Sequence, residues 1–273
     1  MFLWDDASPT ADYGWVRGGR RPLLWIPAGD ADRAQDAALR VLNLTVAAVG
    51  LLIAAPVMVA IAAAIKATSP GPVLYRQLRV GLDRRNSSAR DDSESDGGRR
   101  TGDLGGRPFV MYKFRTMITD AEADGGPRWA DPDDERSTAF GRFLRRHRLD
   151  ELPQLWNVLK GDMAVVGPRP ERPLFVQQLR ETVDGYSHRH RVRPGITGWA
   201  QVNREPDRSV DDVEVKLRYD FDYLRRRSIW FDSYIMLRTP LVMARREETA
   251  DVRRSRPRRN RPHDRRRREP TDV

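Results

Sequence analysis

The stretch VLNLTVAAVGLLIAAPVMVAIAAAI, residues 41–65, decides how this chain is organised. It runs uncharged between Arg40 and Lys66. At about 1.5 Å of rise per residue, a helix of this length can cross a hydrocarbon layer about 30 Å thick. A buried helix of a soluble domain is the alternative, but so long an uncharged run is unusual there. We therefore favour insertion into a membrane.

The charges around this run do not favour a simple membrane span. Basic residues lie on both sides of it, namely Arg33, Arg40, Lys66, Arg76 and Arg79. The positive-inside rule assigns both flanks to the cytoplasm. Pro56 lies near the middle of the run, where it removes a backbone hydrogen bond and kinks a helix. We predict a re-entrant helix-break-helix over residues 37–66 that enters and leaves the membrane on one face.

Basic charge is concentrated at the C-terminal end. Lysine and arginine outnumber acidic residues by 49 to 39, which gives +10, but residues 253–268 alone hold ten arginines and one aspartate. Such a segment suits nucleic acid or an anionic membrane surface. Its prolines and its lack of apolar periodicity instead predict a disordered tail over residues 244–273, and we do not expect nucleic acid as a partner.

Cysteine is absent, which excludes disulfides, a thiolate nucleophile and sulfur-ligated metals. The four histidines follow no metal-binding spacing. A metal site built on cysteine or histidine is therefore not expected.

Composition divides the rest of the chain. Residues 1–36 mix Gly, Pro, Asp and Arg without periodicity, which predicts a flexible extension. Residues 67–243 are expected to form the catalytic domain, mainly α with a few short strands (α+β), and the low-complexity residues 83–106 to form a flexible loop inserted in it.

The segment RPFVMYKFRTM, residues 107–117, has the alternation of a β-strand. It places Lys113 and Arg115 on one face and Tyr112 and Phe114 on the other. A solvated strand face and a binding surface are equally compatible with this pattern.

Two adjacent carboxylates, Asp150 and Glu151, lie in RLDELPQLWN, residues 148–157. Proline suits the first position of a helix, so a helix is predicted to begin at Pro153. Apolar residues with helical spacing follow and predict a buried stripe, with Gly161 as a stop: Leu152, Leu155, Trp156 and Leu159. The two acids then lie at the positive end of the helix dipole, where an ordinary acidic helix start would also place them.

Arginines surround this pair, which an acidic helix start does not explain. They are Arg145, Arg146 and Arg148 upstream, and Arg169 between the prolines of GPRP at 167–170. Arginine binds phosphate oxygens through a planar, bidentate fork. A carboxylate in such company can bind a divalent metal or attack a phosphorus centre.

Four motifs carry a resemblance to a known family. GPVLYRQLRVG (71–81), YKFRTM (112–117), LDELPQLWNVLKGDMAVVGPRPERP (149–173) and RVRPGITGWAQVN (191–203) resemble the bacterial sugar transferases, which are monotopic polyprenyl-phosphate phosphoglycosyl transferases. The match covers roughly residues 36–243 in the family's order. It departs from the family at Ala55-Pro56, where Ser-Pro is usual, at Arg148, where serine is common, and at Asn203-Arg204, which lacks an intervening glycine.

The resemblance implies transfer of a sugar 1-phosphate from a UDP-sugar to undecaprenyl phosphate, with release of UMP, at the start of exopolysaccharide, O-antigen, capsule or glycoconjugate synthesis. It implies that Asp150 is the nucleophile that forms a covalent phosphosugar intermediate and that Glu151 holds Mg²⁺. By the same matching, Lys113, Arg145 and Arg169 contact the nucleotide or its phosphates. The expected location is the bacterial cytoplasmic membrane, with the catalytic domain on the cytoplasmic face.

One motif set serves several sugars, so the resemblance names a reaction but neither a sugar nor an oligomeric state. A hypothesis of another class also stays open. Under this alternative hypothesis, the chain is a catalytically silent, membrane-anchored scaffold or a nucleic-acid-binding protein that uses its arginine-rich tail.

Overall fold

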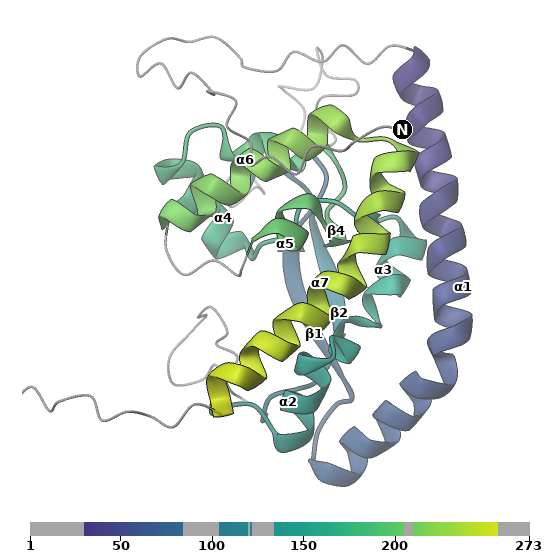
Figure 1. The fold of residues 1–273 in the computed structure, drawn as a ribbon, viewed down its shortest axis with the longest axis vertical. Coiled ribbons are helices and arrows are strands. Elements are labelled where there is room, and N and C mark those ends of the chain that lie inside the picture. Colours follow the sequence, from purple (N-terminus) through teal and green to yellow (C-terminus); the bar gives the residue numbers. More distant parts are fainter. Residues whose placement is uncertain (1–29, 84–103, 120, 122–133, 205–209, 256–273) are drawn as a thin grey trace, which may run out of the picture.

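A computed structural model describes residues 30–83, 104–119, 121, 134–204 and 210–255. The described part is mostly helical and contains two small two-stranded sheets, which confirms the predicted mainly-α class with a few short strands (Figure 1). The predicted inserted loop, the extension and the tail fall largely on residues 84–103, 1–29 and 256–273, which lie outside this part.

The apolar run belongs to α1, a single helix from Asp30 to Thr68 that continues through Pro56. The predicted break is therefore wrong, and the helix begins within the segment that was expected to be an extension. Figure 1 shows that α1 instead bends in its C-terminal part. A proline removes one hydrogen bond, and the alanine- and leucine-rich flanks keep the remaining helical bonds.

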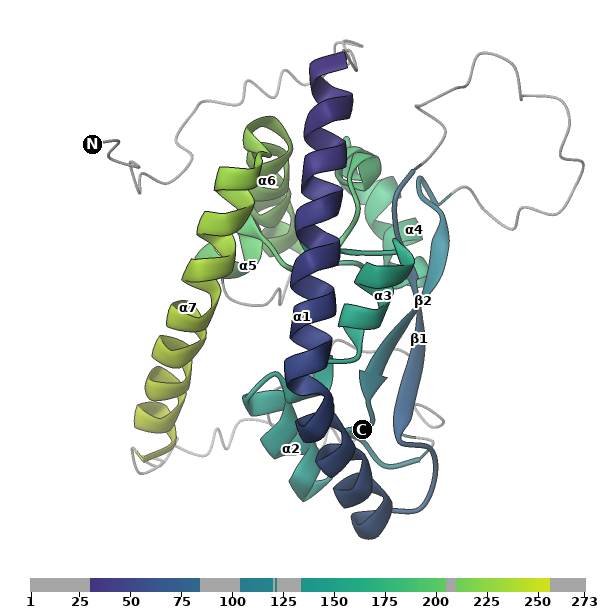
Figure 2. The ribbon, with the colours of Figure 1, turned by 90° about the vertical axis from the view of Figure 1, so that its right-hand side faces the viewer.

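Both ends of α1 pack against the same domain. Near its start, Arg40 donates to the carbonyls of Val158 and Leu159 at 2.7 and 2.9 Å. Near its end, Ile61 and Ile65 are buried in an apolar cluster with side chains from residues that follow α1 in the sequence. Large apolar side chains on the remaining face are exposed: Val41, Val49, Leu52, Ile53 and Val59. Figure 2 shows α1 in front, with α7 on one side and α3 and the β1–β2 hairpin on the other.

The first sheet is an antiparallel hairpin of β1, Leu74–Val80, and β2, Pro108–Phe114. Lys113 pairs with Tyr75 in its register. Asn157 fixes the hairpin to α3, because its side chain accepts from the Tyr112 amide at 3.1 Å and donates to the Val110 carbonyl at 2.7 Å. The basic motif of β2 is thereby held beside the segment that carries the two carboxylates.

Three short helices follow: α2, Ala139–Arg146, the 3₁₀ turn η2, Leu149–Glu151, and α3, Gln154–Lys160. Pro153 is the N-cap of α3 rather than its first residue, and Gly161 ends it in the left-handed region (φ 87°), as its C-cap position requires. The predicted buried stripe is wrong at Trp156, which is 54% exposed. The face of α3 that is buried carries Gln154, Asn157 and Val158 instead.

The second sheet pairs β3, Ala164–Val166, in parallel with β4, Gly195–Thr197. Between these strands the chain forms α4, Pro173–Thr182, and the 3₁₀ turn η3, Tyr186–Arg191. The segment 167–172 leaves β3 and leads into α4, so it begins from a fixed strand end.

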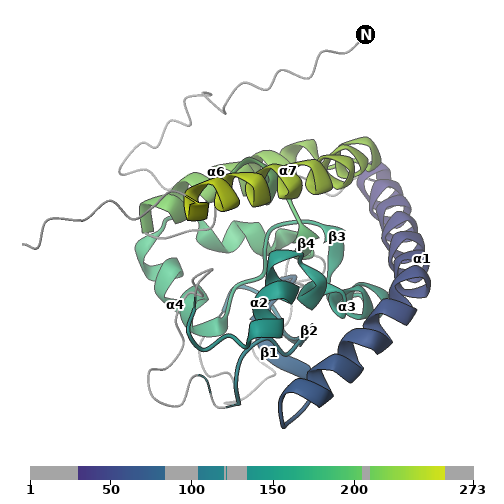
Figure 3. The same cartoon turned by 60° about the horizontal axis from the view of Figure 1, so that its bottom comes forward.

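The C-terminal part contains α5, Trp199–Asn203, α6, Val210–Arg226, and α7, Ile229–Ser255. The first twelve residues of the predicted disordered tail, 244–255, belong to α7. Phe231 and Ile235 of α7 pack with Val166 and Tyr223 in one core cluster. Figure 3 shows α1 and the α6–α7 pair bordering the domain on adjacent sides.

Candidate active site

Asp150 and Glu151 lie together in η2, between α2 and α3 and beside β2. Their residues are only 7% and 6% exposed. The turn begins at Arg148, which has a φ of 55°. Among the residues that the structure describes, it is the one non-glycine residue with positive φ. Strain of this kind collects at functional sites.

Glu151 is the centre of a cluster of cations. Its Oε1 accepts from Lys113 Nζ at 2.9 Å and from Arg169 Nη2 at 3.0 Å, and it lies 3.6 Å from Arg148 Nη1. The three cations come from β2, from the segment after β3 and from the start of η2. We call Asp150, Glu151 and these three residues the Glu151 cluster. With its five groups ionised, the cluster carries one net positive charge and suits an anion.

The cations hold Glu151 in its ionised form. Burial alone would raise the pKa of this carboxyl, but Lys113, Arg169 and Arg148 together lower it well below its usual range. Glu151 in turn raises the pKa of Arg169 above its ordinary value, against the opposing effect of burial. Burial lowers the pKa of Lys113, and Glu151 opposes that change.

Asp150 has a different environment, although it is the adjacent residue. Burial raises its pKa, while Lys113 opposes the increase and the charge on Glu151 adds to it. Its Oδ1 is buried and has no hydrogen-bond partner among the residues that the structure describes. A buried polar oxygen without a partner is rare and needs an explanation. Here it leaves a carboxylate oxygen ready for a ligand or a bond.

The structure brings together four of the predicted site residues: Lys113, Asp150, Glu151 and Arg169. The contacts described for Glu151 do not include Arg145. Its Nη1 donates to Ser137 Oγ at 2.9 Å, at the N-terminal end of α2. A role for Arg145 toward a nucleotide stays a prediction.

The sequence analysis placed Arg148 among the arginines near the acids but assigned it no binding role. The available signal was the arginine itself, two residues before the acids, where the resembling family commonly has serine. It also missed Asn157, whose buried amide joins α3 to β2. Nothing in the apolar spacing of α3 marks this asparagine.

The residues around the acids are compatible with Mg²⁺, which usually takes one or two carboxylates and completes its shell with water and substrate phosphate oxygens. Carboxylate oxygens are available here, among them Asp150 Oδ1, which has no hydrogen-bond partner among the described residues. The three contacts between Glu151 and the cations all involve its Oε1, so they do not occupy its second oxygen, Oε2. Within the described residues, no group of three or more His, Cys, Asp or Glu side chains forms a metal site, so substrate oxygens would have to complete the shell.

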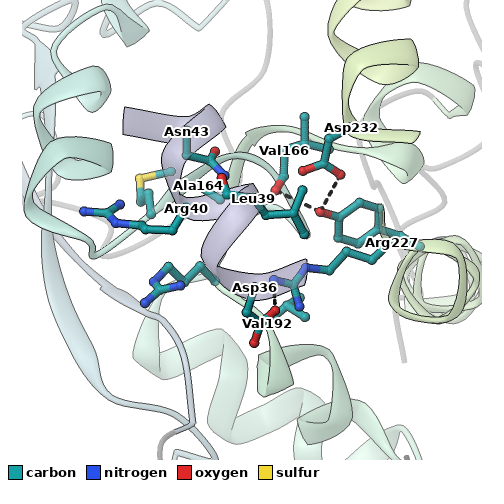
Figure 4. A pocket seen from close by; sticks show the side chains of 12 residues that line it. Asp36, Leu39, Arg40, Asn43, Ala164, Val166, Val192, Arg227 and Asp232 are labelled. Carbon is teal, nitrogen blue, oxygen red and sulfur yellow. Dashed lines mark hydrogen bonds and ion pairs between the residues drawn. The ribbon is translucent and has the colours of Figure 1, made fainter. Parts of the chain in front are cut away.

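A small cavity lies elsewhere, between α1, β3 and the α6–α7 corner (Figure 4). Arg227 pairs with Asp36 across it, and the Tyr223 hydroxyl lies 3.0 Å from Asp232 Oδ1. Burial raises the pKa of Asp232 to about 7. No member of the Glu151 cluster lines this cavity, so it is separate from the candidate active site.

A family model described as bacterial sugar transferase matches residues 34–89 and 97–246. The chain belongs to the bacterial sugar transferase family. The match includes α1 from residue 34 onward and every member of the Glu151 cluster. The recognition made from the four motifs is thereby confirmed.

The chain is similar in sequence to several curated members of this family whose names state a reaction. The chain is 40% identical over 220 residues to a UDP-glucose:undecaprenyl-phosphate glucose-1-phosphate transferase of Escherichia coli, covering 80% of this chain. It is 39% identical over 200 residues, 73% of this chain, to a UDP-N-acetylgalactosamine-undecaprenyl-phosphate N-acetylgalactosaminephosphotransferase of Aeromonas hydrophila. The chain spans 42% of the length of each of these two relatives.

A shorter relative aligns over most of both chains. It is a UDP-glucose:undecaprenyl-phosphate glucose-1-phosphate transferase of Caulobacter vibrioides, 38% identical over 243 residues, which are 87% of this chain and 82% of the relative.

Proposed function

We propose that this chain transfers the sugar 1-phosphate of a UDP-sugar to undecaprenyl phosphate and releases UMP, as an initiating step of bacterial glycan synthesis. One observation carries the proposal. Three cations converge on buried Glu151 beside Asp150, whose Oδ1 has no hydrogen-bond partner within the described part of the chain. The names of the relatives support the two substrate classes, because they specify a UDP-sugar and undecaprenyl phosphate.

In the proposed first step, a carboxylate oxygen of Asp150 attacks the phosphorus that bears the sugar. The bond from that phosphorus to the bridging oxygen of the diphosphate breaks, and UMP leaves with the electron pair. In the second step, a phosphate oxygen of undecaprenyl phosphate attacks the same phosphorus and releases Asp150. Each step forms one P–O bond and breaks another, and one pocket serves both substrates in turn.

The cations solve an electrostatic difficulty of the first step. A diphosphate repels a carboxylate, so positive groups must offset the charge before attack and must stabilise the leaving phosphate. Arg169 and Arg148 have side chains that are 32% and 41% exposed, so they can reach a ligand while they stay close to Glu151. The side chain of Lys113 is only 15% exposed, and its charge helps to keep Glu151 ionised.

We propose that Mg²⁺ assists this chemistry, held by Glu151 and by oxygens of the bound diphosphate. It would supply further neutralisation of the diphosphate and of the departing UMP. The surroundings of the two acids support these roles, Glu151 as the metal ligand and Asp150 as the nucleophile, since cations hold Glu151 ionised and Asp150 has the unpartnered oxygen.

We also propose that α1 is set in the cytoplasmic membrane and that both of its ends lie on the cytoplasmic face. The helix is long and apolar enough to cross a membrane. Arg40 near its start and Ile65 near its end both contact the catalytic domain, which argues against a simple span with that domain on one side. The basic flanks on both sides favour the same topology.

The covalent step can be tested without the lipid acceptor. Purified protein is incubated with Mg²⁺ and, one at a time, UDP-glucose, UDP-N-acetylgalactosamine and other UDP-sugars, and then acidified and analysed by mass spectrometry. We expect one sugar to release UMP and to add its sugar 1-phosphate to the peptide that carries Asp150, and to add none in Asp150→Asn. Turnover with lipid present but with no adduct on this peptide would contradict the covalent route.

A further inference from the structure

The segment 169–171, which carries Arg169 into the Glu151 cluster, is fixed through its main-chain carbonyls. The carbonyl of Arg169 accepts from Arg189 Nη2 at 2.9 Å. The next two carbonyls are bound by β1, from Arg79 Nη1 at 2.9 Å and from the Val80 amide at 3.0 Å. A short, non-helical segment is therefore held at three successive residues.

Arg189 is itself held from three directions. It lies in η3 and is 2% exposed. The Nη2 that binds the Arg169 carbonyl also lies 2.9 Å from Asp220 Oδ2 of α6, and Nη1 donates to the Tyr186 hydroxyl at 2.7 Å. One guanidinium nitrogen thus connects the main chain of Arg169 to a buried carboxylate on a long helix.

Stability alone does not explain so costly an arrangement. A buried ion pair contributes little net stability compared with apolar residues of the same volume. An arginine fork does supply fixed directions for several hydrogen bonds at once, which lysine cannot supply. What these directions determine here is the position of the residue whose side chain meets Glu151 at 3.0 Å.

We infer that Arg189 is a positioning residue for Arg169, and that Asp220 orients Arg189 for this task. Arg189 does not contact Glu151 in the structure; it acts through the backbone of residue 169. This inference rests on the proposed function for its kinetic consequence, since Arg169 is there expected to meet the diphosphate. Its structural content, a fixed segment 169–171, stands separately.

The test uses Arg189→Lys, which keeps the charge beside Asp220 and removes the fork. We expect kcat/KM for UMP release to fall by about 10–100-fold, because displacement of a binding group by an ångström has effects of this size. Arg226→Lys is the matched control. Arg226 also pairs with an aspartate of α6, at 3.0 Å, but its guanidinium packs over the Phe231 ring and not against segment 169–171. Activity of this variant should stay within about twofold of wild type.

A double-variant cycle separates positioning from general destabilisation. If Arg189 acts through Arg169, then Arg189→Lys should change kcat/KM by less than about twofold when Arg169→Met is already present. The inference would be overturned if the loss of kcat/KM in the double variant equalled the product of the losses in the two single variants. Full activity of Arg189→Lys alone would also overturn it. Asp220→Asn provides a second, milder variant, with a smaller loss that Arg169→Met should equally abolish.

Amide hydrogen exchange provides a readout that needs no turnover. The Val80 amide donates to the Glu171 carbonyl, so it reports whether the segment is held. We expect faster exchange at Val80 in Arg189→Lys and no change in Arg226→Lys. If the wild-type protein released UMP from no UDP-sugar, the proposed function would fail, and exchange would still decide this inference: unchanged protection at Val80 would overturn it.

Discussion

Two glutamates, the buried Glu151 and the half-buried Glu171, are each surrounded by cations, but their partners differ in access to solvent. Glu171 accepts from Lys216 Nζ at 3.0 Å and lies 3.5 Å from Arg79, and those side chains are only 11% and 15% exposed. At Glu151, Arg169 and Arg148 are 32% and 41% exposed. The ion pairs at Glu171 therefore fix the chain, whereas the exposed cations at Glu151 are accessible to a ligand.

The neighbours of the two glutamates sharpen this contrast. Lys216 and Arg79 lower the pKa of Glu171 to about 2 although burial raises it, so Glu171, like Glu151, is ionised. Only Glu151 has an adjacent carboxylate with an unpartnered buried oxygen. Between these two glutamates, the adjacent carboxylate and the exposed cations are what distinguish the candidate reaction centre at Glu151 from the structural support at Glu171.

The largest effect is expected from Asp150→Asn. Loss of a nucleophile lowers turnover by about 10⁴-fold or more. Stability should not fall at pH 8, because burial already disfavours the ionised form of this carboxyl. UMP release and the thermal unfolding midpoint are the measurements. The exposed Asp184→Asn is the matched control and should keep wild-type turnover.

Replacing one cation of each glutamate by methionine should separate the two regions. Arg169→Met is expected to lower kcat/KM by about 10²-fold, since it removes a donor from the developing charge, with little change in stability. Lys216→Met is expected to lower the free energy of unfolding by about 3 kcal/mol, because it takes one of the two cations from a carboxylate whose side chain is only 14% exposed.

The pH dependence checks the second half of this comparison. The lowered pKa of Glu171 means that its contribution to stability is present above its unfolded pKa, about 4.5, and is lost as the pH falls toward 2. The deficit of Lys216→Met in urea unfolding should therefore be largest near neutral pH and should shrink in acid. A deficit that does not vary with pH would contradict the assignment of Glu171 as the affected group.

A smaller effect is expected in the pH profile of Lys113→Met. Lys113 is the main group that opposes the raised pKa of Asp150, so its removal raises that pKa further. The acid limb of kcat/KM for UMP release, measured between about pH 5 and pH 9, should move to higher pH. Lys160→Met, which removes a surface pair with Asp162, should leave this limb unchanged.

The smallest effect is expected from Arg148→Gly. Glycine removes the cost of a positive φ, about 1 kcal/mol, and loses a partly exposed ion pair of similar or smaller size. The free energy of unfolding should stay within about 1 kcal/mol, while KM for the sugar nucleotide rises about threefold through the lost charge. An unchanged KM would remove Arg148 from the set of ligand-binding cations.

Sequence reasoning succeeded where a residue's chemistry is local to its motif. The adjacent acids, the lysine of YKFRTM and the arginine of GPRP meet as the motifs suggested. It failed where tertiary packing decides. Apolar spacing placed Trp156 in a buried stripe, but α3 turns its polar Asn157 toward β2 and exposes the tryptophan.

Long-range pairs left no signal in the sequence. Arg189 and Asp220 are ordinary members of charged segments until the fold brings them within 2.9 Å of each other. Likewise, Pro56 predicts that the helix is distorted, but it does not predict whether the helix bends or breaks. Whether a helix breaks or bends depends on the contacts on either side of the proline, here those of Arg40 and Ile65.

The contact between α1 and α3 has a consequence for the environment of the reaction. Gly50 packs so closely on Leu155 that an added Cβ would lie 3.3 Å from its side chain, and α3 begins three residues after Glu151. If α1 is set in a bilayer as we propose, a change in its tilt is transmitted through this contact to the two carboxylates. The thickness of the surrounding lipid then becomes a variable of the enzyme's kinetics, comparable to pH or metal concentration.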